Sequence, residues 1–163
     1  MRRLRPADWL VLWSALFAAA SLSVDWFHVD AVPLAPDAVG YAPLASGMTG
    51  WDALGWATVA LILLTTALGL ALVALIAAGS RDAVNLPPGV FLAAITPLAL
   101  LVTLVVTLSK TGGRTTLDDG GWVGLGAMAA LAAGAWLSLR DERTNQPSRQ
   151  VEQPPARPAP PAA

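Results

Sequence analysis

The side chains best suited to ligand or acid–base chemistry gather in the segment DWFHVD, residues 25–30. Asp25, His28 and Asp30 place an imidazole between two carboxylates, and a divalent cation accepts both ligand types. However, His28 is the only histidine and the chain has no cysteine, so the common zinc-ligand sets cannot be assembled around it. We therefore interpret the cluster as a solvated acidic loop, and we predict neither a metal site nor a cofactor.

Groups for nucleophilic or proton-transfer chemistry are missing from the places where a membrane enzyme needs them. The serines near the N-terminus lie outside any Gly-x-Ser-x-Gly context. Ionisable side chains at mid-membrane depth are usually functional, yet the interiors of the long apolar runs contain no Asp, Glu, Lys, Arg or His. This pattern argues against a proton-coupled transporter and an intramembrane protease, and it predicts that the protein is not an enzyme.

The composition indicates which elements position these residues. Of the 163 residues, 55% are hydrophobic and 13% are charged, about half the charge of a soluble domain. A soluble enzyme is therefore excluded, and a net charge of −1 gives no footprint for nucleic acid. About 20 apolar residues in a helix cross the hydrocarbon core. Runs of that kind cover residues 9–27, 51–78, 88–108 and 120–139, which predicts an all-α integral membrane protein with four transmembrane helices in an antiparallel bundle.

Lysine and arginine set the predicted orientation, because cytoplasmic segments of membrane proteins carry the excess of positive charge. With a cytoplasmic N-terminus, the outer loops are residues 28–50 and 109–119. The protein then lies in the cytoplasmic (inner) cell membrane, with both termini on the cytoplasmic side. The inner segments then hold Arg2, Arg3, Arg5, Arg81, Arg140, Arg143, Arg149 and Arg157, and the outer segments hold Lys110 and Arg114. Residues 1–140 form the predicted membrane domain. Residues 141–163 are polar and then rich in proline and alanine, and they form a predicted disordered tail.

One alternative concerns the first run, because MRRLR followed by an apolar stretch and small residues is similar to a signal peptide. Cleavage would leave three spans and an outer N-terminus. Aromatic residues on both sides of the run favour a retained helix with interfacial anchors. Tryptophans also lie near the ends of the other runs, and we interpret the set as an aromatic belt: Trp9, Trp26, Trp51, Trp56, Trp122 and Trp136.

Small residues on the fourth run predict close helix packing, because helices in lipid associate through van der Waals fit. The predicted packing positions are Gly120, Gly124, Gly126, Ala130 and Gly134. They favour packing within the bundle, with homo-oligomerisation as the alternative. Pro97 lies in the middle of the third run and predicts a kink. A static bend is favoured there over a transporter hinge.

With these segments in place, the chain resembles small four-span proteins of unknown function from high-GC actinobacteria. The matching parts are TGWDALGW at the second run, the short loop RDAVNLPPG, and GGWVGLGAMAALAAGAWLSLRDER at the fourth run. The resemblance covers most of residues 49–143 and implies no activity.

These observations predict a non-enzymatic membrane protein that acts by packing in the lipid bilayer with itself or with another membrane protein. The alternative is a small transporter or channel subunit that works as an oligomer. Only the kink at Pro97 and the hydroxyl groups of the second and third runs support that alternative. They belong to Thr65, Thr66, Thr96, Thr103 and Thr107.

Overall fold

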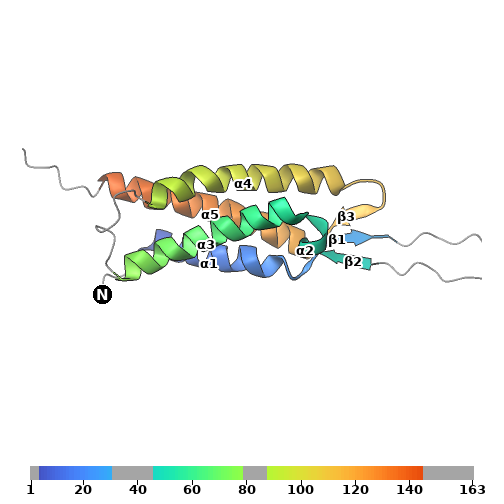
Figure 1. Cartoon of the computed structure of the whole chain (residues 1–163), viewed down its shortest axis with the longest axis horizontal. Helices are drawn as coiled ribbons and strands as arrows, with labels where there is room; N and C mark the ends of the chain where they lie inside the picture. The colour runs from blue at the N-terminus through green and yellow to red at the C-terminus, as the bar shows by residue number, and fades with distance from the viewer. Residues whose placement is uncertain (1–3, 31–45, 79–87, 145–163) are drawn as a thin grey trace, which may run out of the picture.

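A computed structural model describes residues 4–30, 46–78 and 88–144. Four long helices lie along one another in it (Figure 1): α1 (Pro6–Ser21), α3 (Trp56–Ala78), α4 (Pro88–Lys110) and α5 (Asp119–Thr144). Helix α1 packs against α3 and α5, and α4 packs against the same two helices. A small β-sheet lies at one end of the molecule, which we call the sheet end.

The sequence explains where α1 and α4 begin. Pro6 and Pro88 stand at the first helical positions, where proline's fixed φ suits the helix and its missing N–H costs no hydrogen bond. In α1, the Asp8 carboxylate accepts the backbone N–H of Arg5 at 2.9 Å. A carboxylate in the first turn also interacts favourably with the positive end of the helix dipole.

Two of the predicted runs differ from the helices in their bounds. The run 51–78 is divided into the short helix α2 (Gly50–Ala53) and α3, because Gly55 between them has a φ of +79°. That backbone conformation ends a helix and favours glycine. The run 9–27 is helical only to Ser21, and its last residues belong to a strand. The runs 88–108 and 120–139 lie within α4 and α5.

The all-α prediction was wrong at the sheet end, where three short strands form an antiparallel sheet. They are β1 (Asp25–Val29), β2 (Ser46–Thr49) and β3 (Thr115–Leu117), in the order β2-β1-β3. Phe27 pairs with Met48 of β2 and with Leu117 of β3. The two segments predicted as outer loops therefore meet in one sheet through β1.

The interior of the helix bundle contains two apolar clusters. The cluster near the sheet includes Leu22, Trp26, Phe27, Leu54, Ile62, Ala99 and Met128. The second cluster, towards the opposite end, includes Val11, Ala15, Leu72, Ile76, Leu92 and Leu131. On α3 the buried residues between Ile62 and Leu72 are two threonines and a glycine. Hydroxyl groups therefore separate the two clusters on this helix.

The exterior of the helices is that of a protein in lipid. Large apolar side chains are exposed along all four helices, among them Phe17, Leu64, Leu98, Leu101, Val105, Leu108 and Leu137. Apart from Ser109 near the end of α4, which is exposed, the hydroxyl side chains described within the four long helices face inward at 5% exposure or less: Ser14, Ser21, Thr58, Thr65, Thr66, Thr96, Thr103, Thr107 and Ser138. Proteins in water show the opposite preference. Within the described residues, three helices are long and apolar enough to cross a membrane: Trp56–Ala78, Gly89–Lys110 and Asp119–Arg140.

Candidate functional site

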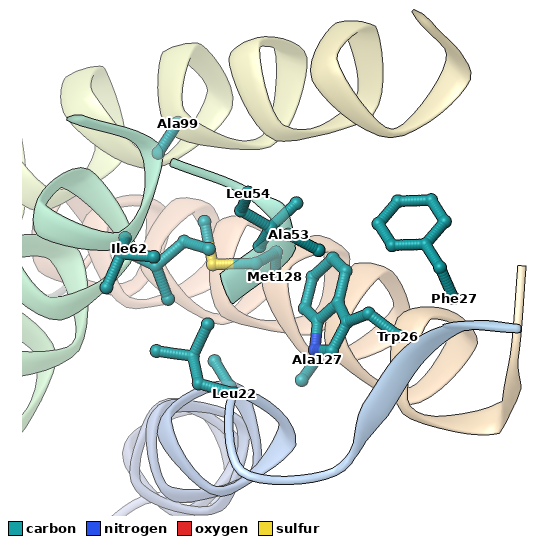
Figure 2. Packing of buried hydrophobic residues seen from close by; sticks show 11 residues of the cluster. Leu22, Trp26, Phe27, Ala53, Leu54, Ile62, Ala99, Ala127 and Met128 are labelled. Atoms are coloured by element: carbon teal, nitrogen blue, oxygen red, sulfur yellow. The ribbon is translucent and has the colours of Figure 1, made fainter. Parts of the chain in front are cut away.

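Trp26 is fully buried at the sheet end, where it fills a space bounded by α1, α2 and α5. Its Nε1 donates a hydrogen bond to the carbonyl of Ser21 at 2.7 Å, and this carbonyl at the end of α1 also accepts the backbone N–H of Val24 at 3.1 Å. A Cβ at Gly124 would overlap Cζ2 of the indole, and a Cβ at Gly50 would lie 2.7 Å from Nε1. The two glycines therefore create the space that the indole occupies. Figure 2 shows Trp26 and Phe27 with the other buried residues of this cluster.

A bulge in β1 explains how two consecutive residues of a strand are both buried. The pairing between β1 and β2 shifts between Asp25 and Phe27, and a bulge of this kind redirects side chains. Trp26 and Phe27 are 0% and 1% exposed. The prediction that Trp26 is an interfacial anchor was therefore wrong. The sequence feature that indicates a strand here is the composition of DWFHV, because aromatic and β-branched residues such as Trp, Phe and Val favour strands.

The three polar residues of DWFHVD do not form one site. His28 Nε2 and Asp30 Oδ1 are 4.0 Å apart, and their side chains are 42% and 64% exposed. The Asp25 carboxyl group lies instead against Gly47 of β2, so that a Cβ at Gly47 would overlap it. Among the residues that the structure describes, no three His, Cys, Asp or Glu side chains are grouped to hold a metal ion. At this separation, and with both groups exposed, the His28–Asp30 pair contributes little to stability.

The small residues of α5 are divided between two sides of the helix. Gly120 and Gly124 face the chain around Asp25 and Trp26, and Gly134 faces Val11 of α1. By contrast, Gly126 is exposed, and a Cβ there would meet no atom within 4 Å. Ala130 is half-buried. The five positions therefore do not form a single packing stripe.

Helix geometry explains this division. The two-residue step from Gly124 to Gly126 turns about 200° around the axis, so the second glycine points away from the first. Steps of four residues then drift by about 40° each, and the line from Gly126 through Ala130 returns to the interior only at Gly134. Gly126, Ala130 and Gly134 are equally spaced in the sequence, but this spacing does not place them on one side of the helix.

Pro97 lies inside α4 on its exposed side. It has no N–H and cannot donate to the carbonyl four residues earlier. The neighbouring Thr96 hydroxyl is buried and bonds to the carbonyl of Leu92. Pro97 leaves the carbonyl of Ala93 without its helical donor. The Thr96 hydroxyl bonds to the carbonyl of Leu92, which is one residue earlier.

The other tryptophans of the predicted belt are exposed. Trp51, Trp56 and Trp122 are near the sheet end, and Trp9 and Trp136 are near the opposite end. Their exposed fractions range from 46% at Trp9 to 86% at Trp56. The two groups stand at the ends of the apolar exterior, where indole rings prefer the lipid headgroup zone. Comparisons with family models, curated proteins and solved structures find no match for this chain.

Proposed function

We propose that the chain is a four-span protein of the cytoplasmic cell membrane, with both termini inside and the sheet end outside. The distribution of Lys and Arg over the sequence supports this orientation. Helix α1 is the fourth span in this proposal, although its 16 residues cover only about 24 Å. Its exposed Trp13, Leu16 and Phe17 suit contact with lipid. The resemblance to small actinobacterial membrane proteins belongs to the same proposal.

The proposed function is packing with a second membrane protein, or with another copy of the chain, without enzymatic activity. The carrying observation is Gly126, which lies on the exposed side of α5 with open space above it. Exposed Trp122 and Trp136 lie on α5 before and after it. A helix with an exposed small residue lets another backbone approach closely, and this is how helices associate in lipid.

Crosslinking in native membranes tests the packing proposal, and the chain has no cysteine to interfere. We expect Ala133→Cys, which is exposed on α5, to form a disulfide-linked product. Adding Gly126→Ile should weaken the association about tenfold, equivalent to about 1.4 kcal/mol, because the larger side chain prevents close approach. The matched control is Leu101→Cys on the exposed side of α4. Equal crosslinking of Ala133→Cys and Leu101→Cys would contradict the proposal.

The buried hydroxyl groups favour a second candidate, a small transporter or channel subunit that acts as an oligomer. Thr65, Thr96 and Thr103 face the interior rather than lipid, although each bonds to a carbonyl of its own helix. Hydroxyl groups in a bundle interior suit a path for small polar solutes. We expect solute flux above the background of empty vesicles after reconstitution into liposomes, and flux equal to that background would count against this candidate.

A further inference from the structure

Two buried hydroxyl groups differ from the other inward-facing ones. Within the described part of the chain, the Oγ1 atoms of Thr66 and Thr107 have no hydrogen-bond partner. Their residues are 5% and 1% exposed. A buried hydroxyl without a partner loses its hydration free energy with no compensation, so such groups in native proteins usually bind ordered water.

Other threonines of α3 and α4 do have hydrogen-bond partners, so a threonine in a helix does not by itself have an unpaired hydroxyl group. Thr65 Oγ1 donates to the carbonyl of Ile62 at 2.9 Å, and Thr103 Oγ1 donates to that of Ala99 at 2.8 Å. A threonine in a helix commonly makes this bond to its own backbone. Thr66 and Thr107 make none, so their hydroxyl groups remain available to a ligand.

These two residues lie at different depths in the bundle. Thr107 is one turn from Lys110, where α4 ends near the sheet. Thr66 is midway along α3, in the hydroxyl-containing stretch between the two apolar clusters.

We propose that the interior faces of α3 and α4 bind water at Thr66 and at Thr107. The ligand class is water or a neutral solute of similar size, because the interior faces of these two helices carry hydroxyl groups and no charged side chain. This inference goes beyond packing with a partner, and it holds for a single copy of the chain.

The sign of a stability change tests the proposal. In a hydrated interior, Thr66→Val and Thr107→Val remove a group that binds water, and each should lower the melting temperature by about 2–4 °C. In a dry interior, the same changes remove an unpaired polar group and should raise the melting temperature. The matched controls are Thr65→Val and Thr103→Val, whose hydroxyl groups bond to their own helices. Melting temperatures equal to or above those of the controls would overturn the proposal.

Cysteine accessibility gives a second measurement that does not depend on stability. In membranes, Thr66→Cys and Thr107→Cys should react with Ag⁺ about tenfold faster than Leu101→Cys, because only a hydrated thiol ionises readily. Leu101 faces the lipid side and is 57% exposed. Protection from later maleimide labelling in denaturant reports the reaction. Reaction rates no higher than that of Leu101→Cys would overturn the proposal.

Discussion

Gly124→Ala is expected to destabilise the protein by about 1–3 kcal/mol, the usual cost of overpacking a rigid core. The new Cβ would overlap Cζ2 of Trp26, lie 2.7 Å from Cη2, and lie 2.8 Å from Ser21 Oγ. The indole cannot move aside easily, because its Nε1 is bonded to the Ser21 carbonyl and the side chain is fully buried. Alanine's better helix propensity returns about 1 kcal/mol at most, so the clash dominates.

The control for this experiment is Gly126→Ala on the same helix. A Cβ at Gly126 meets nothing within 4 Å, so this change should be neutral or slightly stabilising. Thermal unfolding of both variants in the same mild detergent provides the comparison. If Gly124→Ala unfolds at the same temperature as Gly126→Ala, Trp26 does not occupy the space that the structure assigns to it.

Leu101→Arg is expected to impair membrane integration by about 2.5–3.5 kcal/mol, the cost of a charge at the centre of a transmembrane helix. Leu101 is near the middle of α4 and is 57% exposed. On a protein surface in water, the same change would alter stability by about 0.5 kcal/mol or less. The size of the free-energy cost therefore distinguishes lipid from water around the exposed face of α4.

The membrane-integrated fraction after synthesis into native membranes measures the effect. Thr116→Arg is the control, because Thr116 is exposed on β3 at the sheet end, away from the apolar helix surfaces. We expect this control to integrate like the unmodified chain. Integration of Leu101→Arg at the control level would contradict a lipid-facing α4.

The apolar helices could be predicted from the sequence because their signal is local. Residues 88–108 and 120–139 are continuous apolar segments, and lipid requires a helix there whatever the tertiary contacts. The residues after Ser21 are apolar for a different reason. Trp26 and Phe27 cover the ends of the helices and do not face lipid, and hydrophobicity alone does not separate these two uses.

The sheet and the glycine contacts depend on partners that are remote in sequence. β1 pairs with β3, although β2, α2, α3 and α4 lie between them in the chain, and strands of three to five residues carry little periodicity. Likewise, Gly124 is a packing residue because Trp26 lies against it, whereas Gly126 faces outward. The residue types were visible in the sequence, but their roles follow from which side of α5 each one occupies.

The pairing of β1 with β3 also constrains the order of events during synthesis. β1 follows the first helix, but its central position in the sheet is completed only by β3, which leaves the ribosome after α3 and α4. Trp26 depends on an even later segment, because Gly124 belongs to the last helix. A nascent chain that ends before β3 therefore holds an unpaired edge of β1, and the indole of Trp26 stays uncovered until α5 is also made. Unpaired strand edges and exposed apolar side chains promote misassembly, so this stage of synthesis exposes both, and β3 and then α5 cover them.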